Sequence, residues 1–194
     1  MPPTLPNSIL KMAIKNTKRL IVDSDVMQAA GYKNEPPSSK ICREVLTTIL
    51  NICHRVVLTE TLQEEWSRHA EQSAFSRYWQ VEMAGRHEKL LAVRNSTRNR
   101  PLLDKLDQVV TDENIKARLR KDIHLVEAAL LADKIVISMN ERDRNHFHSY
   151  AGEIEELRQI MWVNPTNSNE EVIEWLREGA KLDRTRCLGY IPHE

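Results

Sequence analysis

Acidic side chains follow the apolar runs of this chain at several separate points, and their chemistry suits a divalent cation. Carboxylates gathered without basic partners repel one another, which costs stability unless a cation is present. Hard oxygen ligands select Mg²⁺ or Mn²⁺, ions that polarise a phosphate and lower the pKa of bound water, so that a phosphodiester can be cut without a covalent intermediate. The candidate ligands are Asp23 with Asp25, Glu65 or its neighbour Glu64, Asp122, and the pair Asn140 and Asp143.

The segment 121–147 predicts how the later candidates are held. Apolar residues recur at helical spacing between Ile123 and Leu130, which indicates a helix with Asp122 in its first turn. Residues 134–138 then contain three consecutive β-branched apolar residues, typical of a strand covered on both faces in a parallel sheet. Polar residues follow at the end of this strand, which is where open α/β sheets bind ligands.

The rest of the chain alternates between strand and helix patterns. The predicted strands are 19–23, 55–59, 134–138 and 160–163, and the predicted helices are 40–53, 62–83 (long or broken near Ser73), 102–110, one starting at Thr111 and Asp112, 154–160 and 169–182. Residues 84–100 fit neither pattern. This alternation predicts an α/β three-layer sandwich with a central parallel sheet of about four to five strands. Right-handed crossovers place all strand ends, and hence the candidate acids, at one edge.

Three regions of the chain are expected to differ in role. Residues 1–18 hold three prolines and predict an N-terminal arm, 19–164 the main α/β domain, and 165–194 a C-terminal helical extension packed on it. The four tryptophans are expected in the core.

Composition excludes several classes of protein. The 194 residues carry 28 basic and 28 acidic side chains, so the chain has no global positive field for nucleic acid, and any such contact must be local. Three cysteines match no zinc pattern and predict reduced thiols in a cytoplasmic protein. No apolar run is long enough for a signal peptide or a membrane span, so no membrane partner is expected.

Three quoted motifs also carry a resemblance. IVDSDVM, VVLTETLQEEW and KDIHLVEAALLADKIVISMNERDRNHF, in this order and spacing, resemble a PIN domain over roughly residues 19–163. The resemblance implies a Mg²⁺- or Mn²⁺-dependent ribonuclease, as in the toxins of many bacterial toxin–antitoxin pairs. It implies RNA as the substrate, and an antitoxin protein or a homodimer as further partners.

The family's acids fall on named residues of this chain. The first, second and third match Asp23, Glu65 and Asp122, with Glu64 left open beside Glu65. The fourth position is Asn140, a neutral amide that can still offer a carbonyl oxygen but removes one negative charge. Asp143 shares its face if the following residues are helical. The resemblance thus implies Asp23, Glu65 and Asp122 as catalytic residues and Asp23, Asp122, Asn140 and Asp143 as metal ligands.

Side chains that could hold the substrate flank these acids. They are Ser138, Lys121, Arg142 and Arg144, with Arg118 and Arg120 one turn earlier. A solvated basic face is an equal alternative. The histidines have no catalytic spacing; they include His54, His69, His87, His124, His146 and His148. Each acid also has an ordinary structural explanation, as the cap or first-turn residue of a helix or as a surface residue.

Two other functions compete with the ribonuclease. LIVDSDVM also resembles the nucleophile motif of haloacid-dehalogenase-like phosphatases, but the later acidic pairs at 155–156 and 170–171 fall within helical patterns. A PIN-like fold kept as an RNA-binding or protein-interaction module is the second alternative. The neutral Asn140 supports this module, whereas three retained acids argue against it.

Overall fold

The centre of the molecule is a five-stranded sheet in which every neighbouring pair of strands is parallel. A computed structural model describes residues 17–31, 36–70, 73–93 and 100–192. The strand order is β3-β2-β1-β4-β5. The strands are β1 (Arg19–Val22), β2 (Arg55–Thr59), β3 (Leu90–Val93), β4 (Ile135–Ile137) and β5 (Met161–Val163). The predicted α/β sandwich with a parallel sheet is therefore confirmed.

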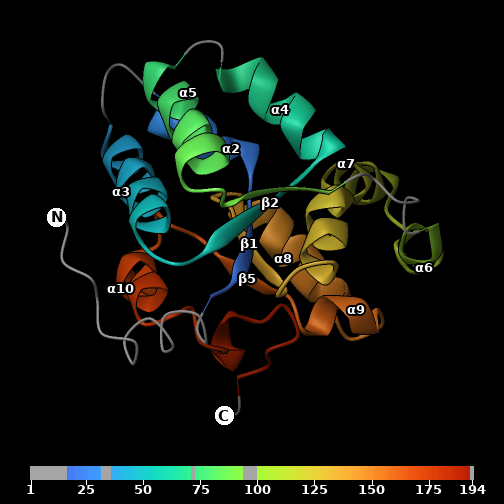
Figure 1. Ribbon diagram of the computed structural model, residues 1–194. Helices are drawn as coiled ribbons and strands as arrows, with labels where there is room; N and C mark the ends of the chain where they lie inside the picture. The colour runs from blue at the N-terminus through green and yellow to red at the C-terminus, as the bar shows by residue number, and fades with distance from the viewer. Residues whose placement is uncertain (1–16, 32–35, 71–72, 94–99, 193–194) are drawn as a thin grey trace, which may run out of the picture.

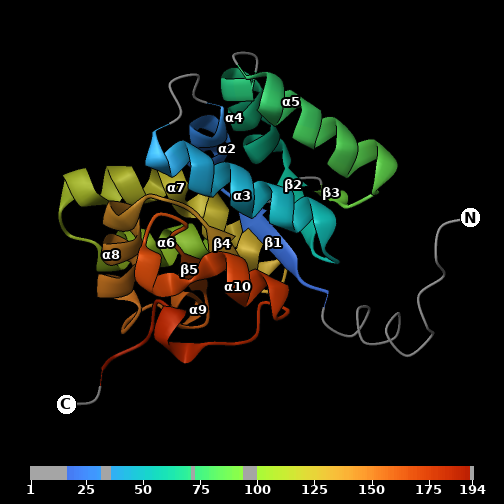
Figure 2. The same ribbon diagram turned by 90° about the vertical axis from the view of Figure 1, so that its left-hand side faces the viewer.

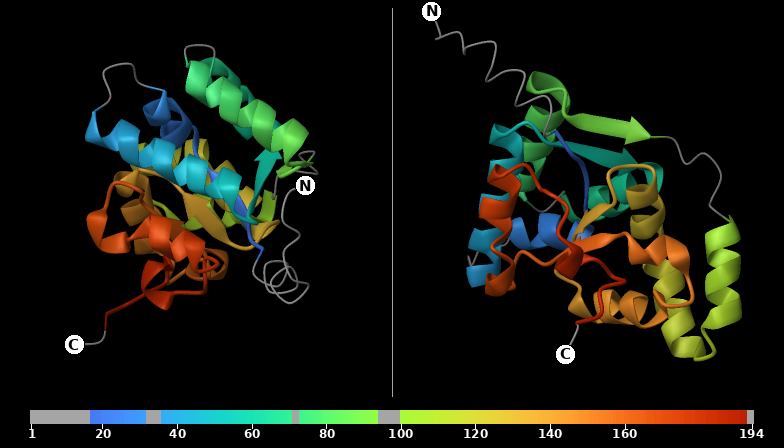
Figure 3. Two further views of the ribbon diagram at one scale, coloured as in Figure 1. Left: turned by 60° about the vertical axis from the view of Figure 1, so that its left-hand side comes forward. Right: turned by 90° about the horizontal axis from the view of Figure 1, so that it is seen from below.

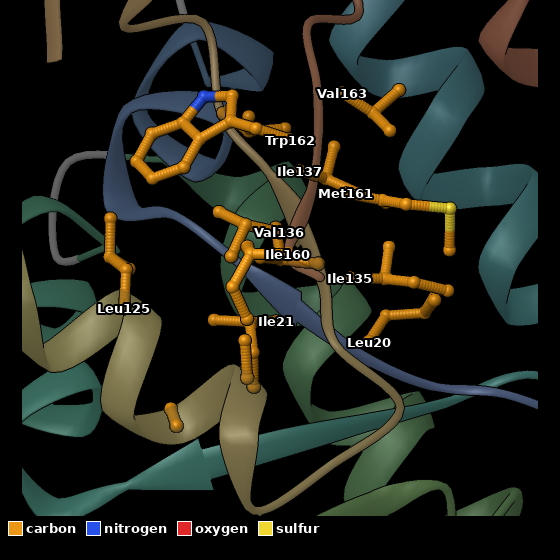
Figure 4. Close-up of a cluster of buried hydrophobic side chains, with 14 of the residues drawn as sticks. Leu20, Ile21, Leu125, Ile135, Val136, Ile137, Ile160, Met161, Trp162 and Val163 are labelled. Carbon is orange, nitrogen blue, oxygen red and sulfur yellow. The ribbon is translucent and has the colours of Figure 1, made fainter. Parts of the chain in front are cut away.

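Alternation along the strands divides the core between the two faces of the sheet. Ile21, Val136 and Trp162 lie in register on neighbouring strands. Figure 4 shows these three side chains on the same side as Leu125, whereas Leu20 points to the opposite side. All five side chains are buried. Side chains two positions apart along a strand share a face. Asp23, two residues after Ile21, is therefore directed to the Leu125 side of the sheet.

The helices form a layer on each face. One layer holds α2 (Ser24–Ala30), α3 (Pro37–Asn51), α4 (Glu60–Ala70), α5 (Ala74–Val81) and, after the last strand, α10 (Val172–Arg177). Figures 1 and 2 show α10 beside α3. The other layer holds α6 (Arg100–Val109), α7 (Glu113–Leu130), α8 (Glu141–Tyr150) and α9 (Glu155–Arg158). Figure 3 shows α6 packed along the outside of α7.

The helix that carries Asp122 begins earlier than predicted. Asp112 caps α7 by accepting hydrogen bonds from the backbone N–H groups of Asn114 (2.8 Å) and Ile115 (3.0 Å). The predicted helix at 111 and the predicted helix at 121 are thus one continuous element. Asp122 lies in its middle and not in a first turn, so the macrodipole explanation for this acid is wrong.

Several other elements agree only in part with the boundaries that the sequence predicts. The helix expected over 62–83 breaks where anticipated, because the Ser73 hydroxyl caps α5 by accepting from the Ser76 N–H at 3.2 Å. The unassigned segment 84–100 contains β3, the missed fifth strand. The helix expected over 169–182 is shorter, since 168–170 form a separate 3-10 turn, η2 (Ser168–Glu170). The predicted arm at 1–18 falls almost entirely outside the described residues.

The C-terminal segment packs back onto the sheet. The Leu188 N–H donates to the Ile160 carbonyl at 2.8 Å, and Cys187 pairs with Met161 of β5 in an isolated antiparallel β-bridge. All four tryptophans are buried and all three cysteines are free, as expected. Among the described residues, no helix has the length and apolar character needed to cross a membrane.

Candidate functional site

The sheet order reverses between β1 and β4, and the candidate acids gather there. The chain leaves β1 toward one helix layer and leaves β4 toward the other, which makes this edge the topological switch point of the sheet. In open α/β sheets the crevice at such a point is where ligands bind. Asp23 directly follows β1 and Ser138 directly follows β4.

The Asp23 carboxylate is held at this edge by hydrogen bonds from neighbouring hydroxyl groups. Asp23 occupies the N-cap position of α2, but its carboxylate accepts no capping hydrogen bond. Its Oδ2 accepts from the Ser138 hydroxyl at 2.7 Å and its Oδ1 from the Ser24 hydroxyl at 3.3 Å. Burial raises the pKa of Asp23, the Ser138 hydrogen bond opposes this, and the Glu65 charge raises the pKa further. Ser138 therefore orients this carboxylate, while the backbone N–H of Asp25 makes the smallest contribution to its pKa and lowers it.

Asp25, in the first turn of α2, is hydrogen-bonded to the loop that follows β4. Its Oδ2 accepts from the Met139 N–H at 2.9 Å and from the Ser138 hydroxyl at 3.3 Å, which ties the start of α2 to the loop after β4. Its Oδ1 is buried without a hydrogen-bond partner. Burial, and then the charge of Asp23, raises the pKa of Asp25 well above its ordinary value. Asp25 is thus a positioning residue with one unused oxygen.

Helix α4, in the same layer as α2, brings Glu65 toward Asp23. The Trp66 indole donates to the Val22 carbonyl at 3.1 Å, which fixes the inner face of α4 to the end of β1. Glu65 lies on this inner side, with 15% of its side chain exposed, whereas Glu64 is exposed to solvent. The geometry therefore favours Glu65 over Glu64 as the acid of this site.

A histidine that the sequence did not single out is paired with this acid. His124 Nε2 lies 3.2 Å from Glu65 Oε2, and its Nδ1 lies 2.9 Å from the Lys121 carbonyl oxygen. The Nδ1 contact has hydrogen-bond geometry, whereas the Nε2 contact with Glu65 does not and is an ion pair when the imidazole is protonated. Burial alone would lower the pKa of His124, but Glu65 outweighs this and raises it. Burial would likewise raise the pKa of Glu65, and His124 lowers it.

Asp122 and Asp143 form a second acidic pair between α7 and α8. Burial, a hydrogen bond with Asp143, and the charges of Asp143 and Asp23 together raise the pKa of Asp122 to about 8. Asp143 is 1% exposed, and its Oδ1 has no hydrogen-bond partner. Two carboxyl groups this close cannot both ionise without cost, so Asp122 retains its proton at neutral pH unless a cation replaces it.

Asn140 positions Asp143. As the N-cap of α8, its Oδ1 accepts from the Asp143 N–H at 3.2 Å, and its Nδ2 donates to the Asp143 carboxylate. Residues 141–150 are helical, which is the condition under which Asp143 shares the face of Asn140. Both polar side-chain atoms of Asn140 thus have partners, whereas Asp143 Oδ1 has no hydrogen-bond partner.

The donor set suits a hard divalent cation. Asp23, Asp122 and Asp143 converge from three elements, and burial leaves one oxygen each of Asp25 and Asp143 without a donor. Oxygen-only ligands of this kind prefer Mg²⁺ or Mn²⁺. In the described part of the chain, no three acidic, histidine or cysteine side chains already surround one point as ready ligands.

The predicted substrate-binding residues are distributed unevenly. Lys121 is exposed on α7 beside Asp122, and Arg142 is exposed on α8. Arg144 instead faces the C-terminal segment, where Nη1 binds Glu170 Oε1 at 2.5 Å and lies 3.4 Å from Glu141 Oε1. The structure therefore does not bring Arg144 to the acids. Arg120 is likewise held away from them, because its Nε binds Asp107 Oδ1 at 2.7 Å.

Comparison of the chain with protein-family profiles, with curated proteins and with solved structures finds no match to any of them. The resemblance to PIN domains consequently rests on the quoted motifs.

Proposed function

We propose that this protein is a divalent-metal-dependent ribonuclease that hydrolyses RNA phosphodiesters at the acidic cluster between β1 and β4. The observation that carries the proposal is the gathering of buried acids at this edge: burial, Asp143 and Asp23 raise the pKa of Asp122 to about 8, and Glu65 in turn helps to raise the pKa of Asp23. Such crowding is unfavourable in an empty protein and becomes favourable when a cation binds. RNA as the substrate follows from the resemblance to PIN domains.

Each residue of the cluster has a role in this proposal. Asp23, Asp122 and Asp143 would hold the ion, which when bound supplies Lewis acidity toward a phosphate and an acidified water. Ser138 holds Asp23 in its orientation through the 2.7 Å hydrogen bond. His124 holds Glu65 beside the same edge, where this carboxylate can accept a proton from a water molecule.

Cleavage of a single-stranded RNA in Mg²⁺ or Mn²⁺ tests the proposal. We expect Asp23→Asn and Asp122→Asn each to lose at least about tenfold in rate, roughly 1.4 kcal/mol of barrier. Asp104→Asn, which neutralises an exposed acid of α6, is the matched control and should cut at the wild-type rate. Equal rates for all four proteins would assign the nuclease to a contaminant or to another site.

A PIN-like RNA-binding or interaction module without catalysis is the second candidate. It is favoured by the ion pair that already neutralises Glu65 and by the full occupation of the Asn140 amide. A pure binder need not be stabilised by a divalent ion, so a melting temperature that ignores Mn²⁺ would favour it. The haloacid-dehalogenase-like alternative gains no support, because one of its late acids, Glu170, is bound to Arg144 and Arg186.

An antitoxin partner and a homodimer, which the resemblance also implies, stay predictions.

A further inference from the structure

The partly exposed side chain of Arg118 lies next to a buried carboxylate of the acidic cluster. Arg118 precedes Asp122 by one turn of α7, and its Nη1 lies 3.8 Å from Oδ1 of the buried Asp143. The arginine side chain remains 39% exposed, so its guanidinium faces both the cluster and solvent. It is thus placed to contact an ion-bound carboxylate and an incoming ligand.

The contact with Asp143 is electrostatic and not a hydrogen bond. At 3.8 Å the two groups are beyond hydrogen-bond distance, and Asp143 Oδ1 has no hydrogen-bond donor. Other basic residues of the same helix are held more closely. Arg120 binds Asp107 at 2.7 Å and Lys116 binds Glu113 at 2.7 Å. Of these three basic side chains, Arg118 is therefore the one that is most easily displaced. It lies beside the Asp143 oxygen that a divalent ion would use as a ligand.

We propose that Arg118 is a substrate-binding residue that exchanges partners: a divalent ion takes its place beside Asp143, and the released guanidinium binds a phosphate of the RNA. This inference rests on the proposed ribonuclease function. A guanidinium matches two phosphate oxygens with paired donors, which suits it to this exchange. Its exposed position one turn from Asp122 would place that phosphate at the edge of the acidic cluster.

The exchange predicts effects of opposite sign on the two ligands. Without the Arg118 charge, a divalent ion no longer competes with an internal cation, so Arg118→Gln should bind Mn²⁺ about threefold to tenfold more tightly. The same variant loses one phosphate contact and should bind RNA more weakly. The slope of log K against log salt for single-stranded RNA should fall by about 0.7. This loss should occur only when a divalent ion is present.

The experiment compares wild type, Arg118→Gln, Arg118→Lys and Arg120→Gln. Calorimetry measures Mn²⁺ binding in the absence of RNA. Binding of a short mixed-sequence single-stranded RNA is then measured over a range of salt, once in Ca²⁺ as a probe and once in EDTA. Arg120→Gln is the matched control, since Arg120 lies two residues away and pairs with Asp107. Circular dichroism melts establish that each variant is folded.

We expect tighter Mn²⁺ binding and a lower salt slope in Ca²⁺ for Arg118→Gln and neither change for Arg120→Gln. Arg118→Lys should keep the wild-type salt slope, because the charge remains, but bind RNA more weakly than wild type, because the paired donors are lost. The inference is overturned if Arg118→Gln behaves like Arg120→Gln, or if its RNA binding falls equally in Ca²⁺ and EDTA. A wild-type protein that binds no Mn²⁺ and cuts no RNA would instead overturn the proposed function itself.

Discussion

Asp122→Asn should stabilise the protein in metal-free buffer, and the gain should grow as the pH rises. The folded protein holds the pKa of Asp122 at about 8, against an ordinary value of 3.8. Between these values the folded state carries a proton that the unfolded state has lost. Stability therefore falls as the pH rises through this window, and a neutral amide removes that dependence.

The size of the effect follows from the same pKa. The full difference corresponds to at most about 5–6 kcal/mol above pH 8. Partial exposure of Asp122 and screening by solvent reduce this figure. We expect Asp122→Asn to gain about 1–2 kcal/mol more at pH 8 than at pH 5, or roughly 3–6 °C in melting temperature for a domain of this size.

Thermal melts in EDTA at the two pH values measure this difference directly. Asp104→Asn is the control for removing any acid, because its side chain is exposed on α6. Mn²⁺ should reverse the ranking, since wild type gains stability by binding the ion and Asp122→Asn gains less. A gain that is the same at pH 5 and pH 8, or equal to that of Asp104→Asn, would refute the reasoning that Asp122 is buried against other acids.

Three further predictions concern the neighbours of this pair. Glu65→Gln should lower RNA cleavage at least about fivefold while Glu64→Gln leaves it unchanged, because only Glu65 faces the cluster; single-turnover assays measure both. In Mn²⁺ calorimetry, Asp143→Asn should weaken binding about tenfold and Asn140→Asp should gain little, and the reverse order would make Asn140 the ligand. Trp66→Phe should cost about 1–3 kcal/mol in urea unfolding through the lost hydrogen bond and volume, and no loss would contradict the anchoring of α4.

The sheet could be predicted because its strands are strongly apolar. The runs at 20–22, 56–58 and 135–137 are fully covered, so their composition alone marks them as central parallel strands. The edge strand β3 was missed because its residues are only partly buried and follow a basic, irregular stretch. A half-buried edge strand carries a weaker signal than a central one.

The acids could be predicted by their place after these runs, but their partners could not. Asp23 follows β1 directly, so its position was visible in the sequence. His124 and Glu65 are far apart in the chain and meet only because α4 packs against α7. The sequence likewise could not decide whether Asn140 or Asp143 takes the fourth acidic position. The answer depends on which amide and carboxylate atoms are used in capping α8.

Calorimetric titration of Mn²⁺ into wild type and Asp23→Asn tests the central claim most directly. Asp23 accepts a hydrogen bond from Ser138 and interacts electrostatically with Glu65 and Asp122. The proposed function predicts saturable binding by wild type and at least about tenfold weaker binding by the variant. Absence of binding to wild type, or equal affinity for the two proteins, would contradict it.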